Sequence, residues 1–174
     1  MDKLRNYDIS FSGLKNGKHN FQFETDKEFF QLFDTEQEFT NPKIKVDVLL
    51  DKHSTFLEVV ISTKGTVDLV CDITNEDFTH PIENEIKVLV KFGEEYDDSE
   101  EDVITIPINS HDFNIAQLIY ENVVLSIPMK KLSPNVKKED LEILEKFSPK
   151  EIEKEEEQNS DPRWEALKKL RNNN

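Results

Sequence analysis

Cys71 is the residue whose possible chemistry is easiest to define. It opens Cys71-Asp72-Ile73-Thr74, which has the spacing of a Cys-x-x-Cys metal or redox pair but carries Thr74 in place of the second cysteine. The chain has one cysteine, and one thiolate cannot hold zinc without three more good ligands. No Lys, Arg or His adjoins Cys71 to lower its pKa. We therefore expect a half-buried structural cysteine, with a reactive thiol as the alternative.

Three carboxylates suggest a second kind of chemistry. Asp68, Asp72 and Glu76 lie close together in the sequence, so an RNA nuclease that uses clustered carboxylates with Mg²⁺ is one hypothesis. A tight cluster would need acids from other strands as well. The histidines are scattered, and four separated glycines exclude a phosphate-binding loop. We expect no catalytic residue, no metal, no cofactor and no small-molecule substrate.

Residues 94–102 hold seven acidic side chains in nine positions. Such a run cannot pack, so we expect a solvated loop. It lacks the glycine and the ligand spacing of a calcium loop. An acidic surface repels phosphate and attracts basic partners. The partner-binding residues that we expect here are Asp97, Asp98, Glu100, Glu101 and Asp102.

The C-terminal segment combines an aromatic with basic side chains. Asp161 and Pro162 predict the start of a helix after a charged linker. One interpretation is that its apolar stripe packs back onto the sheet. The other is a tethered arm that contacts ribosomal RNA or a protein groove. The residues that would make those contacts are Arg163, Trp164, Leu167, Lys168 and Lys169.

The N-terminal half predicts strands and one short helix that could position these residues. Apolar side chains alternate over 7–11 and 21–23 with Asn16-Gly17 between them, which predicts a β-hairpin. Thr25-Asp26-Lys27-Glu28 fits a capping box before a short helix. Further alternation over 44–48, 57–61, 67–71 and 86–92 predicts half-buried antiparallel strands, with a turn at 63–66.

The C-terminal half predicts one more strand and the main helix. Residues 103–106 form a short strand that Pro107 stops. Asp112 can cap a helix that ends at residues 126–128 and covers one face of the sheet. The apolar face of this helix comprises Ile115, Leu118, Ile119 and Val123.

Composition favours one folded domain with tails. The chain has 174 residues, of which 36% are hydrophobic, and a net charge of −15. Its longest run without a charged side chain, 103–111, is too short to span a membrane. The N-terminus opens no apolar segment, so we expect no secretory signal, no membrane association and a cytoplasmic location. Residues 66–136 carry 15 acidic and 4 basic side chains, which disfavours binding of bare nucleic acid.

Several stretches together suggest a family. Residues 64–74 and 78–82 have a small-residue turn, a strand, the position of a Cys-x-x-Cys pair and a second strand. An acidic insertion follows these stretches. Asp112-Phe113 then stands at the expected start of a helix, and 121–128 at its expected end, with Ile127 directly before Pro128. This order, with the tail 162–170, resembles the bacterial and plastid large ribosomal RNA subunit accumulation protein family, the YceD-like proteins. The resemblance covers about 55–130 plus the tail; because Thr74 replaces the second cysteine, a metal or thiol role of other members cannot be carried over.

The resemblance implies a non-enzymatic ribosome-biogenesis factor that supports synthesis, processing or accumulation of large-subunit (23S) ribosomal RNA. It also implies association with a basic large-subunit ribosomal protein, the assembling large subunit or its RNA, which agrees with the acidic charge. The alternatives are a magnesium-dependent RNA-processing enzyme and an interaction module unrelated to ribosomes. A cleft with convergent carboxylates would favour the enzyme, and an acidic convex face without a pocket would favour a binding protein.

The expected fold class is α+β. We predict an antiparallel β-sheet with one main packed helix, one short N-terminal helix and a charged C-terminal tail that ends in a short helix. The expected organisation is a domain over 1–132, a charged linker over 133–160 and a helical arm over 161–174.

Overall fold

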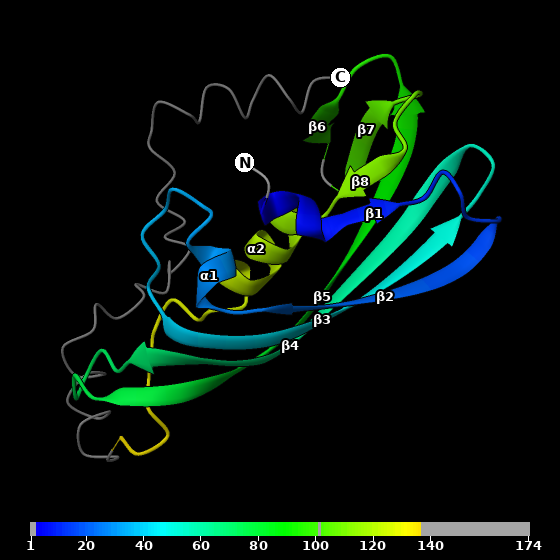
Figure 1. Cartoon of the computed structure of the whole chain (residues 1–174). Coiled ribbons are helices and arrows are strands. Elements are labelled where there is room, and N and C mark those ends of the chain that lie inside the picture. Colours follow the sequence, from blue (N-terminus) through cyan, green and yellow to red (C-terminus); the bar gives the residue numbers. More distant parts are fainter. Residues whose placement is uncertain (1–2, 101, 137–174) are drawn as a thin grey trace, which may run out of the picture. The chain divides into compact units, whose positions relative to one another are not determined.

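Alternating apolar side chains along the chain give rise to a β-rich structure. The computed structural model describes residues 3–100 and 102–136 (Figure 1), and its elements belong to one structural unit, Met1–Asn135. The strands are β1 (Asp8–Ser10), β2 (Gly17–Thr25), β3 (Thr40–Lys52), β4 (Phe56–Val70), β5 (Asp77–Gly93), β6 (Asp97–Glu100), β7 (Val103–Pro107) and β8 (Asp112–Asn114). The helical segments are the 3₁₀-helix η1 (Lys3–Tyr7), α1 (Lys27–Phe30) and α2 (Ala116–Leu125). Within the described residues, no helix has the length and apolar character needed to cross a membrane.

Six strands form one sheet in the order β2-β3-β4-β5-β7-β6, while β1 and β8 pair with each other. Strands β2 to β5 form an antiparallel meander. The prediction of a purely antiparallel sheet is wrong at one position, because β7 pairs parallel to β5. After β5 the chain forms β6 at the edge of the sheet, and it then returns as β7, which lies between β5 and β6.

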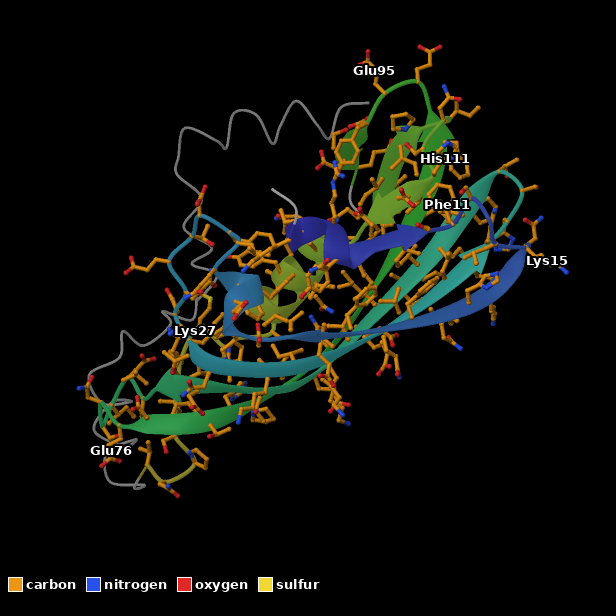
Figure 2. The ribbon with its side chains drawn as sticks, viewed as in Figure 1. Phe11, Lys15, Lys27, Glu76, Glu95 and His111 are labelled. Atoms are coloured by element: carbon orange, nitrogen blue, oxygen red, sulfur yellow. The ribbon has the colours of Figure 1, made fainter. Side chains whose placement is uncertain are left out.

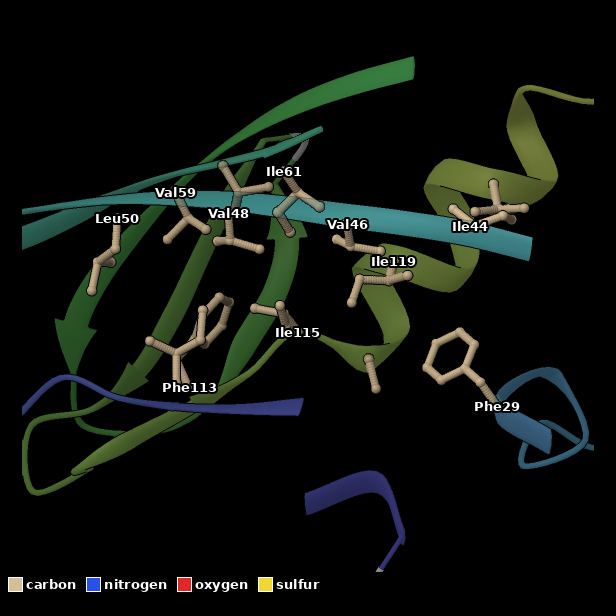
Figure 3. Packing of buried hydrophobic residues seen from close by; sticks show 14 of the residues in the cluster. Phe29, Ile44, Val46, Val48, Leu50, Val59, Ile61, Phe113, Ile115 and Ile119 are labelled. Atoms are coloured by element: carbon tan, nitrogen blue, oxygen red, sulfur yellow. The ribbon is translucent and has the colours of Figure 1, made fainter. Parts of the chain in front are cut away.

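Helix α2 packs on the inner face of the sheet. Ile115, Ile119 and Val123, spaced at one face of a helix, are completely buried. They belong to the same buried apolar cluster as Val46 and Val48 of β3 (Figure 3). The structure is therefore consistent with the predicted α+β fold, and it has one main helix on a sheet and a short N-terminal helix. The predicted terminal helix lies outside the described residues.

The predicted hairpin between residues 7–11 and 21–23 is wrong. Strand β1 pairs with β8, where Ile9 lies opposite Phe113, and β2 pairs with β3. Alternation correctly identifies both segments as strands because it reports which face is buried. It does not identify the partner strand, and Phe113 lies about a hundred residues away from Ile9 in the sequence.

The predicted turn at residues 63–66 is also wrong, because β4 continues through it. Gly65 lies opposite Ile44 in the β3–β4 ladder, next to a register shift between Thr40 and Lys43. A Cβ atom at Gly65 would lie 2.1 Å from the carbonyl oxygen of Lys43. Glycine here therefore permits the close approach of two backbones and does not mark a turn.

The short helix α1 starts one residue later than the capping box predicts. Asp26, and not Thr25, is its N-cap. The Asp26 carboxylate accepts hydrogen bonds from the N–H groups of Glu28 at 2.9 Å and Phe29 at 3.3 Å. The carboxylate thus satisfies the N–H of Glu28 and adds a second acceptor for the N–H of Phe29, which also donates to the Asp26 carbonyl oxygen at 3.1 Å.

Asp112 does not cap α2, contrary to the prediction. It lies in β8, where its carboxylate accepts a hydrogen bond from the hydroxyl of Ser10. Asn114 holds the first turn of the helix instead, because its side-chain oxygen accepts the N–H of Ala116 at 3.1 Å. The strand pairing of residues 112–114 with β1 determines where the helix can begin.

Candidate functional site

The acidic segment 94–102 is only partly the loop that we predicted. Residues 97–100 form β6, the edge strand, which pairs with β7. Every described side chain from Glu94 to Asp102 is exposed, and Glu95 projects from the connection before β6 (Figure 2). A strand forms here because an edge strand can pair its backbone on one side and keep charged side chains in water.

The predicted acidic site residues separate into two groups. Asp98, Glu100 and Asp102 line a groove between the sheet and α2. Asp97 does not; its carboxylate accepts the backbone N–H of Ser99 at 3.0 Å, and hydrogen bonds from Ser99 lower its pKa. Glu101 lies outside the described residues.

The floor of this groove is apolar. The groove has a volume of about 380 Å³. Its apolar lining comes from four elements: Ile86 and Val88 of β5, Val103 and Ile104 of β7, Phe113 of β8, and Leu118 and Leu125 of α2. Of these, Leu125 is 78% exposed, so the groove is open along its α2 side.

The rim of the groove is acidic on both sides. Glu121 lines the groove from the α2 side, and Asp98, Glu100 and Asp102 line it from the sheet side; the described lining residues include these four carboxylates but no Lys, Arg or His. Tyr96 lies between the two sides. Partial removal of its hydroxyl from water raises its pKa, and the nearby charges of Asp98 and Glu121 raise it further. We name this feature, with its apolar floor and the acids Asp98, Glu100, Asp102 and Glu121, the acidic groove.

Sequence reasoning missed the helix side of the acidic groove. We assigned Leu118 to the buried face of α2, but it is only partly buried. Leu118, Glu121 and Leu125 are spaced at i, i+3 and i+7, so they form a second stripe beside the buried one. That spacing is the sequence signal that could have revealed this side of the groove.

The five predicted site residues of the C-terminal segment lie outside the described residues. These are Arg163, Trp164, Leu167, Lys168 and Lys169. Their contacts therefore stay predictions.

Two of the three carboxylates proposed for magnesium accept hydrogen bonds from other groups. The Asp68 carboxylate accepts hydrogen bonds from the side chains of Asn41 at 2.9 Å and Thr79 at 2.8 Å, which lower its pKa. The Asp72 carboxylate accepts the N–H of Lys131 at 2.7 Å. Across residues 3–100 and 102–136, no three His, Cys, Asp or Glu side chains are placed to hold a metal ion together. Asp68, Asp72 and Glu76 do not form such a group in this structure.

Cys71 lies in the connection between β4 and β5 and is buried. Its sulfur accepts the backbone N–H of Ser133 at 3.4 Å. This bond, followed by bonds from the hydroxyl and N–H of Thr74, lowers the thiol pKa to about 7. No Lys, Arg or His adjoins Cys71 in the sequence, but hydrogen bonds from backbone and hydroxyl donors lower its pKa without a neighbouring cation.

Comparison with known families gives one result. Residues 59–171 match the family described as "Large ribosomal RNA subunit accumulation protein YceD". Neither the curated proteins nor the solved structures gave a match to this chain. Because the match covers more than half of the 174 residues, the chain belongs to the YceD family. The family name refers to the accumulation of large-subunit ribosomal RNA.

Proposed function

We propose that this YceD-family chain supports the accumulation of large-subunit ribosomal RNA by binding a basic ribosomal protein of the large subunit. The observation that carries the proposal is the acidic groove, which presents four carboxylates around an apolar floor. None of the ion pairs among the described residues involves these carboxylates. Their negative charge is available to a cationic partner.

A basic protein suits this surface better than bare RNA. Phosphate contacts need Lys and Arg to displace counterions from the nucleic acid. The acidic groove offers only carboxylates among its described charged side chains, so it would repel a phosphate backbone. A cationic protein would gain steering and a faster association rate from the same charges.

Binding also suits this site better than catalysis. The groove is not the convex surface that we expected of a binding protein, but its carboxylates come from two sides, the sheet and α2. They do not converge on a metal-binding point within the described residues. A two-sided acidic rim with an apolar floor is the arrangement that a basic, partly apolar protein surface would match.

The tail would provide a second contact. In this proposal residues 1–132 form the protein-binding domain, 133–160 a charged linker, and 161–174 an arm. Arg163, Trp164, Lys168 and Lys169 combine positive charge with an aromatic ring that can stack on a base. The arm would thereby contact ribosomal RNA or the assembling large subunit.

Co-purification at low salt with identification by mass spectrometry tests the proposal. Wild type should retain basic large-subunit ribosomal proteins, and a variant with Asp98→Asn, Glu100→Gln and Asp102→Asn should retain far less. Glu83→Gln, Glu94→Gln and Glu95→Gln form the matched control, because these exposed acids do not line the groove. Equal recovery by both triple variants would contradict the proposal. A partner list without ribosomal proteins would favour an interaction module unrelated to ribosomes.

A further inference from the structure

We infer that the acidic groove receives an amphipathic helix of the partner, whose apolar side enters the groove and whose Lys or Arg side chains face both rims. This inference rests on the proposed function and specifies which part of a basic partner binds. It follows from the elements that form the floor and the two rims.

One wall of the groove has the spacing that a helix would match. Leu118, Glu121 and Leu125 run along the side of α2. From Leu118 to Leu125 this stripe extends about 10 Å along the helix axis, at about 1.5 Å per residue. A second helix lying beside α2 would therefore contact the stripe over about two turns, at an interaxial distance of about 8–10 Å.

The floor of the groove is the face of the sheet and not its edge. Ile86, Val88 and Ile104 reach it as side chains of β5 and β7. In a sheet the backbone N–H and C=O groups point toward neighbouring strands, while side chains point out of the face. An extended peptide on this face would thus leave its own backbone groups unpaired above apolar side chains.

A helix avoids this penalty because its backbone hydrogen bonds are internal. Its buried side can cover Leu118 and the floor, and can remove Leu125 from water. Its two flanks then lie beside Asp98, Glu100 and Asp102 on one rim and Glu121 on the other. Positive side chains on both flanks of the apolar stripe satisfy this pattern, whereas one-sided charge would leave Glu121, which accepts a hydrogen bond from Gln117 at 2.7 Å, without a cationic partner.

Binding of three labelled peptides to the full chain tests the inference by fluorescence anisotropy. The first peptide has about 14 residues, or about four helical turns, with leucine at helical spacing and lysine on both flanks. The second has the same composition but alternates leucine and lysine, so that it favours a strand. The third keeps the lysines and replaces leucine by serine.

We expect the helical peptide to bind at least about tenfold more tightly than the other two, since each well-buried leucine contributes on the order of a tenfold gain. Leu125→Asn, at an exposed position, should reduce that advantage several-fold, and Leu118→Asn with Leu125→Asn should abolish it. Ile108→Asn is the matched control, because Ile108 is 72% exposed and lies outside the groove. Circular dichroism should show that each variant is folded.

The outcomes separate this inference from the proposed function. If the strand-patterned peptide binds as tightly as the helical one, or if the Leu118/Leu125 variant binds the helical peptide like wild type, the helical inference is wrong. The acidic surface would in that case still serve as a binding site for basic proteins. If no lysine-containing peptide binds, or if neutralising Asp98, Glu100 and Asp102 changes nothing, the proposed use of the acidic groove is itself wrong.

Discussion

Replacing Gly65 by alanine tests whether β4 runs unbroken past β3. The added methyl carbon would lie 2.1 Å from the Lys43 carbonyl oxygen and 2.7 Å from the Ile44 Cα. Non-bonded carbon atoms pack best at about 3.5–4.0 Å, so the β3 backbone would have to move by about 1 Å. Both neighbours are backbone atoms, which cannot rotate away as the end of a side chain can.

The loss of stability caused by Gly65→Ala can be worked out from the hydrogen bonds and packing that a shift of the β3 backbone would disrupt. Losing about two ladder hydrogen bonds costs about 2 kcal/mol, and overpacking strain adds about 1–3 kcal/mol. Alanine also restricts the unfolded chain, which offsets about 0.4–1 kcal/mol. Gly65→Ala should therefore lower the free energy of unfolding by about 3 kcal/mol.

Urea denaturation followed by far-ultraviolet circular dichroism measures this change. Gly13→Ala is the matched control, because no described residue beyond its two chain neighbours has a heavy atom within 4 Å of the added methyl, and its backbone is outside the left-handed region. We expect that control to be neutral or stabilising by up to about 1 kcal/mol. If Gly65→Ala is as stable as Gly13→Ala, β3 and β4 do not approach each other as described.

Three further predictions concern other parts of the chain. Asn122→Ala should lower the free energy of unfolding, measured by urea denaturation, by about 2–3 kcal/mol. The reason is that its buried amide donates hydrogen bonds to the Ile61 carbonyl at 3.3 Å and the Thr63 hydroxyl at 3.2 Å. An unchanged urea midpoint would contradict this prediction. Cys71→Ser should leave ribosomal RNA levels intact. Because folding lowers the pKa of the Cys71 thiol to about 7, wild type should be more stable than Cys71→Ser above the ordinary thiol pKa, and this difference should fade as the pH falls through about 7. Denaturation curves that show the same difference at every pH in this range would refute the prediction. Truncation after residue 147 should barely change the melting temperature of the domain yet abolish activity in cells. Trp164→Ala in the full chain should weaken its binding to the partner by about 2 kcal/mol or more. A truncated chain that melts several degrees lower yet restores ribosomal RNA levels would instead identify the tail as structural.

Local sequence signals were sufficient for many elements of the fold. A strand or helix with one buried face shows that face in its own sequence as a periodic pattern of apolar residues. This pattern is visible in β3, β5 and α2. Strand partners depend on distant residues, and this is why the pairing of β1 with β8 could not be predicted. The role of Gly65 was missed for the same reason, because its close neighbour Lys43 belongs to another strand.

The candidate site was predictable in its charge but not in its shape. Asp98, Glu100 and Asp102 could be identified because a run of acids is visible in the sequence. The apolar floor could not, because it is assembled from β5, β7, β8 and α2 only after folding. The lowered pKa of Cys71 has the same origin, since its first hydrogen-bond donor, Ser133, lies 62 residues away.

The most direct test of the central claim is the ratio of large- to small-subunit ribosomal RNA in cells that lack this chain. The cells would be complemented with wild type, with the Asp98→Asn, Glu100→Gln, Asp102→Asn variant, or with the Glu83→Gln, Glu94→Gln, Glu95→Gln control, each at equal protein level. We expect wild type and the control to restore the ratio and the groove variant to leave it low. Full restoration by the groove variant would contradict the claim that the acidic groove carries the function.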